Sequence, residues 1–205
     1  MEGLDSVIIP PYNENKRVPY PQWLMYSRIV PKDICELIIE EAKKLDHKQG
    51  TVFTSQDTQV VSSMRKTQVR WILKDMQNFF PLFNFIDKII RNVNEAFRVN
   101  CNMVPSIQFT EYLEPGYHYD WHHDVDWNRP DGKSRKISFV VQLSDPSSYE
   151  GGDFEFRHHE NPNQEKLRSQ GTIICFMPYQ EHRVKEILSG SRYSLVGWYE
   201  GPRWV

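Results

Sequence analysis

The chain is organised around Tyr112-Leu-Glu-Pro-Gly116-Tyr-His-Tyr119-Asp-Trp-His122-His-Asp124. Side chains alternate along an extended strand, so the imidazole of His122 is expected to lie beside the carboxylate of Asp124. A third ligand must come from elsewhere, and His182 is the best candidate for a second imidazole. Two imidazoles and one carboxylate on one face of a metal form the facial triad of non-haem Fe(II) sites. The pattern therefore predicts an iron site.

The same stretch contains a competing pair of ligands. His118 and Asp120 also form a His-x-Asp of the same parity, and His123 and Asp126 lie close by. Spacing along a strand does not distinguish these residues from the first pair. From the residues alone, both assignments stay open.

The order of the motifs resembles that of a known enzyme family. The run Gly116-x-x-Tyr119-x-x-His122-x-Asp124 looks like the first metal motif of the prolyl 4-hydroxylase-like 2-oxoglutarate/Fe(II) dioxygenases. The run Gly190-Ser-Arg192-Tyr-Ser194 follows His182 as a Gly-x-Arg or Gly-x-Lys follows the distal histidine of that family. In the family this cation holds the C5 carboxylate of 2-oxoglutarate.

The resemblance implies a set of site residues and cofactors. Its metal ligands are His122, Asp124 and His182, and its co-substrate contacts are Arg192, Ser194 and Tyr112. By the same resemblance His118, Asp120 and His123 are not ligands. The implied cofactors are Fe(II), with 2-oxoglutarate and O2 as co-substrates and ascorbate as an optional addition. Tyr112 has an alternative role in packing the sheet, and Gln142 stands where some relatives place a second tyrosine against the C5 carboxylate.

The position of Arg192 can be checked by strand geometry. The ten residues from His182 to Arg192 would span ~33 Å as one strand, so the two can cooperate only if the chain reverses between them. Leu188-Ser-Gly-Ser191 is a plausible reversal, and the resulting hairpin places Arg192 opposite Ile187. Arg192, Ser194 and Trp198 share parity, which would let Ser194 contact the carboxylate that Arg192 binds.

Length and composition favour one intracellular domain. The chain has 205 residues, a formal net charge of -2 and no sustained basic run, which argues against a nucleic-acid partner. Its cysteines, Cys35, Cys101 and Cys175, have no tight spacing and favour free thiols in a reducing compartment. The first residues have no signal-peptide pattern, and no apolar run approaches the ~18 residues of a membrane span. We therefore expect a soluble, cytoplasmic protein.

Two helices are predicted before residue 105. Residues 23–30 form a strand that Pro31 ends, and Asp33-Ile-Cys-Glu36 is a capping-box pattern opening the first helix. The apolar stripe of that helix comprises Ile34, Leu37, Ile38, Ala42 and Leu45. The second helix begins near Pro81 and has apolar residues at helical spacing: Leu82, Phe85, Ile86, Ile89, Ile90, Val93 and Phe97.

From Ser106 onward the pattern is typical of strands. Short alternating or apolar runs, separated by turn residues, occupy 106–113, 117–124, 136–143, 153–158, 171–177, 182–187 and 192–199. With one strand from the N-terminal half, these would make the eight strands of a double-stranded β-helix, or jelly roll. The predicted fold class is α+β, mainly β. One dioxygenase domain spans 1–205, with an extended arm (1–22), helical support and flanking strands (23–105) and a jelly-roll core (106–199).

The chemistry and the resemblance together predict a hydroxylase. Oxidising an unactivated C–H bond needs a stronger oxidant than any side chain, so a metal must activate O2. The implied substrate is a prolyl residue in a peptide or protein, with a free amino acid or other small molecule as the alternative. A non-catalytic, cupin-like metal-binding protein is the alternative of another class.

Two segments are candidates for the mouth of the site. The loop 125–133 leaves directly from Asp124, and the polar segment 46–66 either forms a second wall or is an ordinary surface connection. Trp121 and Trp127 either offer flat surfaces to a prolyl ring or pack the sheet and its loop.

Overall fold

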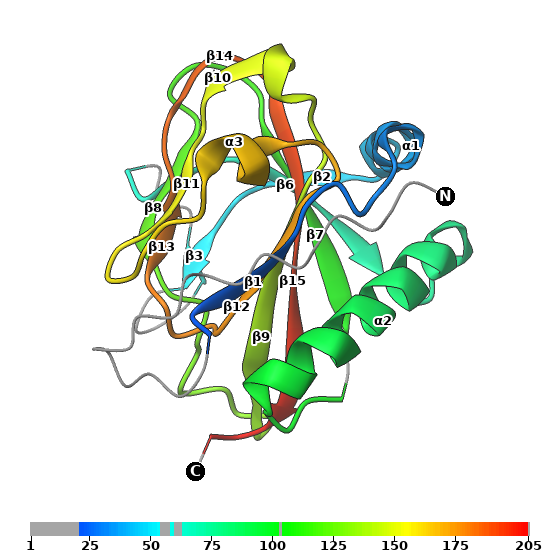
Figure 1. Cartoon of the computed structure of the whole chain (residues 1–205), viewed down its shortest axis with the longest axis vertical. Helices are drawn as coiled ribbons and strands as arrows, with labels where there is room; N and C mark the ends of the chain where they lie inside the picture. Colours follow the sequence, from blue (N-terminus) through cyan, green and yellow to red (C-terminus); the bar gives the residue numbers. More distant parts are fainter. Residues whose placement is uncertain (1–20, 54–57, 60–62, 103, 205) are drawn as a thin grey trace.

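The computed structural model describes residues 21–53, 58–59, 63–102 and 104–204. The larger antiparallel sheet has the strand order β1-β12-β9-β15-β7-β6-β2, and the smaller has the order β11-β13-β8-β5. Figure 1 shows the helices α1 and α2 on the side of the larger sheet that faces away from β8, β11 and β13. This mainly β architecture confirms the predicted jelly roll. The predicted arm falls largely on residues 1–20, which lie outside the described residues.

The strands have the following bounds. The larger sheet contains β1 (Trp23–Tyr26), β12 (Ile173–Phe176), β9 (Lys133–Gln142), β15 (Arg192–Pro202), β7 (Ser106–Tyr112), β6 (Gln68–Leu73) and β2 (His47–Gln49). The smaller sheet contains β11 (Phe154–Phe156), β13 (His182–Val184), β8 (His118–His122) and β5 (Arg65–Lys66). Two further pairs are β10 (Tyr149–Gly151) with β14 (Ile187–Gly190) and β3 (Val52–Phe53) with β4 (Thr58–Gln59). All the predicted runs from Ser106 onward contain a strand.

The larger sheet is buried on both faces, which its apolar runs explain. In β12, Ile173 and Cys175 pack towards the helices, whereas Ile174 and Phe176 pack towards the smaller sheet. Burial raises the pKa of the Cys175 thiol, as expected for a small core residue. The outer layer is mainly α2 (Phe80–Phe97), whose predicted apolar face is buried except for the partly exposed Phe85. Full burial of a side chain such as Ile86 contributes about 1.5–3 kcal/mol.

The first helix corrects two predictions. Helix α1 (Lys32–Lys43) has Pro31 at its N-cap and no side-chain cap, so the predicted capping box is not formed and Asp33 lies in the first turn. The buried stripe is Cys35, Ile38 and Ala42, whereas Ile34 and Leu37 are 41% and 51% exposed. Successive residues lie about 100° apart around a helix axis. Because α1 packs through Cys35, Ile38 and Ala42, Ile34 and Leu37 point away from the centre of its buried face and are exposed.

Short helices complete the described chain. They are η1 (Gln77–Phe79), η2 (Pro146–Ser148) and α3 (Gln164–Arg168). Among the helices of the described residues, none is long and apolar enough to cross a membrane.

The predicted hairpin between His182 and Arg192 is wrong. After β13 the chain enters β14, which pairs with β10, and Arg192 then begins β15 opposite Tyr112 of β7. The chain therefore leaves the smaller sheet and joins the larger one. Gly190 makes this passage possible, because its φ is +72° and an added Cβ would lie 2.0 Å from the carbonyl oxygen of Ser148.

Replacing Gly190 by alanine should destabilise the fold by about 2–5 kcal/mol, the sum of backbone strain and overpacking. Gly132→Ala is the matched control, because Gly132 also has a positive φ (+69°) but has no atom within 4 Å of an added Cβ. It should lose only the strain contribution of about 1–2 kcal/mol. Urea unfolding of both variants measures the difference. Equal losses would mean that the contact with Ser148 relaxes at no cost.

Candidate metal and co-substrate site

The structure brings His122, Asp124 and His182 together. The Nε2 of His122 lies 3.8 Å from Oδ1 of Asp124, and the Nε2 of His182 lies 3.7 Å from Oδ2 of the same carboxylate. The three ligand atoms lie within 4.8 Å of one another, close enough to share one ion. The two histidines face each other across β8 and β13, where His122 pairs with His182.

A β-bulge in β8 decides which residues of the central stretch face the cluster. In the pairing of β13 with β8, His182 lies opposite His122 but Val184 lies opposite Tyr119, so that between these pairs one residue of β13 opposes two of β8. The extra residue reverses the alternation of side chains. Consequently Tyr119 and His122 stack on each other on the inner face, with ring centroids 3.4 Å apart.

Of the competing residues, His118 and Asp120 face away from the cluster, whereas His123 lines the cavity that holds His122 without belonging to the cluster. His118 and Asp120 line a surface hollow together with Arg183 and Lys185, and not the cavity that holds His122. The ring nitrogens of His118 lie 2.9 Å and 3.2 Å from the carbonyl oxygens of Gly116 and Ser63. Only the bulge, which spacing does not reveal, separates the two His-x-Asp pairs.

Both imidazoles are held by the backbone. The Nδ1 of His122 lies 2.7 Å from the carbonyl oxygen of Asp120, and that of His182 lies 2.9 Å from the carbonyl oxygen of Gln180. Each Nδ1 therefore carries the proton and donates it to the carbonyl, which leaves the lone pair of Nε2 directed at Asp124.

The protonation states suit a divalent cation. Burial lowers the pKa of His122 well below its usual value, and the neighbouring His182 lowers it further. Burial alone would raise the pKa of Asp124, but His182, His122, Arg135 and the hydroxyl of Ser138 outweigh it and hold that pKa at about 2. The Ser138 hydroxyl donates to Oδ2 of Asp124 at 2.7 Å. A metal ion binds neutral imidazole and ionised carboxylate, the forms that the lowered pKa values of His122 and Asp124 favour, so two imidazoles and one carboxylate in this cluster fit Fe(II).

Arg192 is a buried cation without an acidic partner. Its side chain is 1% exposed, and its Nη2 donates to Oε1 of Gln142 at 2.8 Å. Nη1 lies 3.5 Å from the hydroxyl of Ser194, and the guanidinium lies 5.0 Å from the ring centroid of Tyr112. Within the described chain no carboxylate lies within 4.0 Å of it. Because an unpaired buried charge is costly, this arrangement favours an anionic ligand.

One cavity of about 770 Å³ contains all the predicted positions: His122, Asp124, His182, Arg192, Ser194 and Tyr112. The polar segment 46–66 supplies part of its wall through Thr51, Val52, Met64 and Arg65, and the loop 125–133 contributes Val125, Asp126 and Arg129. A volume of this size is typical of small-molecule and cofactor sites.

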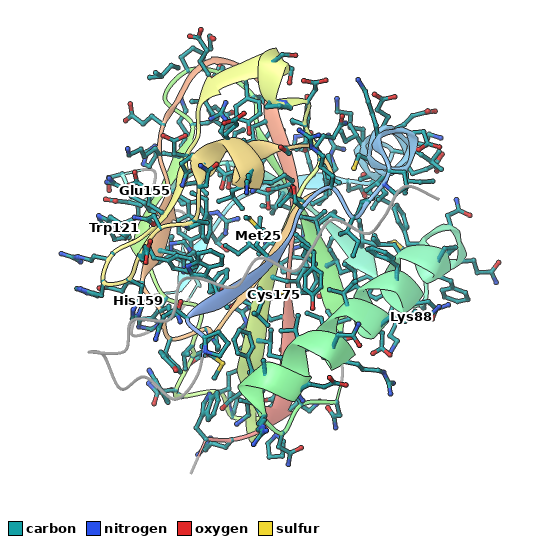
Figure 2. All side chains as sticks on the ribbon, viewed as in Figure 1. Met25, Lys88, Trp121, Glu155, His159 and Cys175 are labelled. Atoms are coloured by element: carbon teal, nitrogen blue, oxygen red, sulfur yellow. The ribbon has the colours of Figure 1, made fainter. Side chains whose placement is uncertain are left out.

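The two tryptophans proposed for the mouth do not line this cavity. Trp121 lies on the outer face of the smaller sheet, as Figure 2 shows, with the guanidinium of Arg183 4.4 Å from its ring centroid. Trp127 is 58% exposed. The tryptophans that do line the cavity are Trp71 and Trp198, whose ring centroids are 6.5 Å apart.

Three residues of the site were not predicted from the sequence: Arg65 and Arg135, which line the cavity, and Ser138, which donates to Asp124. Ser138 had a signal, because it is the one polar residue in the apolar run 137–141. Arg65 and Arg135 had none, since each stands in a polar, charged stretch that is typical of an exposed surface.

Comparison with known proteins adds independent findings. Residues 107–200 match the family model of the 2OG-Fe(II) oxygenase superfamily. A PKHD-type hydroxylase of Prochlorococcus marinus (strain NATL2A) is 33% identical over 115 residues, covering 56% of this chain and 50% of that protein. The chain spans about half the length of the curated relatives it matches first.

Solved structures share the fold. A prolyl-4-hydroxylase of Pseudomonas putida superposes with a TM-score of 0.67 at 16% identity, over 90% of this chain and 94% of that one. A prolyl hydroxylase from Trichoplax adhaerens, solved with a hypoxia inducible factor oxygen degradation domain peptide fragment, superposes with a TM-score of 0.69 at 14% identity, over 87% and 83%. At such identities the likeness extends to the fold alone.

Proposed function

We propose that this chain, which belongs through residues 107–200 to the 2OG-Fe(II) oxygenase superfamily, is an Fe(II) hydroxylase that depends on 2-oxoglutarate and O2. Its proposed substrate is a prolyl residue in a peptide or protein. The observation that carries the proposal is the cluster of His122, Asp124 and His182, whose ligand atoms lie within 4.8 Å of one another inside one cavity.

Each part of the site has a task in this proposal. His122, Asp124 and His182 hold Fe(II), which when bound supplies the activation of O2. Oxidation of 2-oxoglutarate to succinate and CO2 balances the insertion of one oxygen atom into a substrate C–H bond. Arg192 and Ser194 bind the C5 carboxylate, and the hydroxyl of Tyr112, which is 2% exposed, hydrogen-bonds the co-substrate. Ser138 and the two backbone carbonyls keep the ligands in place.

A prolyl substrate is supported by the relatives and by the cavity wall. The named relatives are PKHD-type hydroxylases, and the structural neighbours include prolyl hydroxylases. Trp71 and Trp198 offer flat apolar surfaces on which a saturated ring can pack. A free amino acid or another small molecule is the second candidate, because a cavity of about 770 Å³ suits either.

Proline-rich peptides should raise the release of succinate, and alkylated oligonucleotides should not. Mass spectrometry of the peptide should show the gain of one oxygen atom on proline. Asp124→Asn is the matched control, because it preserves the shape of the side chain and removes the negative charge expected to hold the metal. If free amino acids stimulate turnover and no peptide does, the peptide assignment is wrong while the iron chemistry stands.

A further inference from the structure

Arg65 is a second buried cation without an acidic partner. Its side chain is 6% exposed and lines the cavity that holds His122. Its Nε donates to the hydroxyl of Thr67 at 2.8 Å, and its Nη1 donates to the carbonyl oxygen of Thr51 at 3.0 Å. Its Nη2 donates to Oε1 of Gln108 at 2.7 Å. These acceptors are all neutral, so the charge itself is unbalanced, and a guanidinium has five N–H donors of which two are left.

The surroundings of Arg65 repeat those of Arg192. Each guanidinium donates to a glutamine carbonyl on a strand of the larger sheet, Gln108 for Arg65 and Gln142 for Arg192. Each also faces a tyrosine ring: Arg65 lies 4.4 Å from the centroid of Tyr119, and Arg192 lies 5.0 Å from that of Tyr112. The fold therefore builds the same kind of anion-binding arrangement twice in one cavity.

Strand register keeps the two arrangements apart. Gln142, which holds Arg192, pairs with Ser194 of β15, whereas Gln108, which holds Arg65, pairs with Val196 of the same strand. The two glutamines are therefore two residues, or ~7 Å, apart along the strands, and they lie on either side of β15, two strand spacings or ~10 Å apart. One carboxylate cannot reach both guanidinium groups. The second end of 2-oxoglutarate belongs at the metal, so Arg65 is left for another molecule.

The carboxylates of the cavity do not neutralise Arg65. Those that line it are Asp124, Asp126 and Glu200. Asp124 belongs to the metal cluster, Glu200 forms an ion pair with Arg129, and Asp126 accepts from the backbone N–H of Asn128. Among the described residues Arg65 therefore has no internal counter-ion.

A route from Arg65 to the metal cluster runs through Tyr119. The ring of Tyr119 lies between the guanidinium and His122, at 4.4 Å from the former and with its centroid 3.4 Å from that of the latter. A ligand held by Arg65 thus lies one aromatic ring away from the expected position of the iron.

Trp198 lines the same cavity, and its buried indole N–H has no partner among the described residues.

We propose that Arg65 binds a carboxylate of the molecule that is hydroxylated, and so selects an anionic substrate. The proposal rests on the proposed hydroxylase function and deepens it by naming a substrate class. The carboxylate has three chemical sources: the α-carboxylate of a free amino acid, the C-terminus of a peptide, or an acidic side chain next to the reacting residue.

Matched pairs of ligands separate these sources. They are L-proline and L-prolinamide, a proline-containing peptide with a free or an amidated C-terminus, and an end-blocked peptide with Glu or Gln beside proline. Quenching of tryptophan fluorescence without O2 measures binding, and succinate release measures turnover. For wild-type protein we expect the charged member of one pair to bind roughly 10- to 100-fold more tightly than the neutral one.

Two variants act on the subsite in different ways. Arg65→Gln removes the charge, whereas Gln108→Glu keeps Arg65 and places a carboxylate beside its Nη2, which supplies an internal counter-ion with little change of shape. Both should bring the ratio of charged to neutral affinity close to one and leave 2-oxoglutarate affinity unchanged. Arg183→Gln is the control, since Arg183 is paired with Glu155 on the outer face of the smaller sheet.

The outcomes separate this proposal from the proposed function. Equal binding of charged and neutral ligands to wild type would overturn the carboxylate subsite. A loss of 2-oxoglutarate affinity in both variants would also overturn it and assign Arg65 to the co-substrate. A protein that prefers the charged ligand but neither binds Fe(II) nor releases succinate would keep the subsite and reject the hydroxylase.

Discussion

Replacing His182 by alanine is expected to lower Fe(II) affinity by on the order of 100-fold or more and to abolish turnover. The loss of a partner behind a ligand already costs about 10- to 100-fold in metal affinity, so the loss of a ligand should cost at least as much. His182 contributes one of only two imidazoles in the described cluster. Anaerobic titration with Fe(II) and 2-oxoglutarate, followed by the weak visible charge-transfer band of the chelate, measures the effect.

His118→Ala is the matched control for this experiment. His118 stands in the same strand as His122, but it belongs to the surface hollow on the other side of the bulge. It should bind the metal with unaltered stoichiometry, and His122→Ala should bind none. The reverse result would move the site by four residues along β8. Tight zinc binding by the wild type without the charge-transfer band would favour a cupin-like metal-binding protein.

Arg192→Ala is expected to weaken 2-oxoglutarate binding by roughly 30- to 1000-fold, which corresponds to a loss of about 2–4 kcal/mol of binding free energy. The reason is that one carboxylate of the ligand and the side-chain carbonyl of Gln142 both lose a charged donor. Arg192→Lys keeps the charge but not the planar fork, so it should fall between alanine and wild type. Titration of the anaerobic Fe(II) protein with 2-oxoglutarate gives all three affinities.

An unchanged affinity in Arg192→Ala would contradict the assignment. Far-ultraviolet circular dichroism and urea unfolding of the same samples separate a binding defect from a folding defect, which matters because Arg192 is 1% exposed. If 2-oxoglutarate affinity falls instead in Arg65→Gln, the two buried guanidinium groups have exchanged roles.

Patterns that repeat over several residues could be predicted from the sequence. The apolar periodicity of α2 and the alternation in β7, β9 and β15 follow from burial of one or both faces, and the structure confirms these elements. Features set by a single residue could not. The bulge in β8 leaves no trace in composition, and it decides which histidines face inward.

The erroneous hairpin has a similar cause. A turn pattern at residues 188–191 indicates that the chain changes direction, but it does not say which strand it joins next. The pairing of β14 with β10 and of β15 with β7 determines which strands this segment joins. Arg65 was missed for a related reason, since an arginine in a polar segment is normally exposed and only the folded cavity buries it.

The pairing of His122 with His182 also bears on how the protein folds. These partners are sixty residues apart in the chain, and the strands β9, β10, β11 and β12 lie between them in sequence. Closing so long a loop is entropically costly and becomes favourable only when many other contacts have formed. The two imidazoles should therefore meet late in folding, and amide exchange in β13 should report the last step of assembly rather than its nucleus.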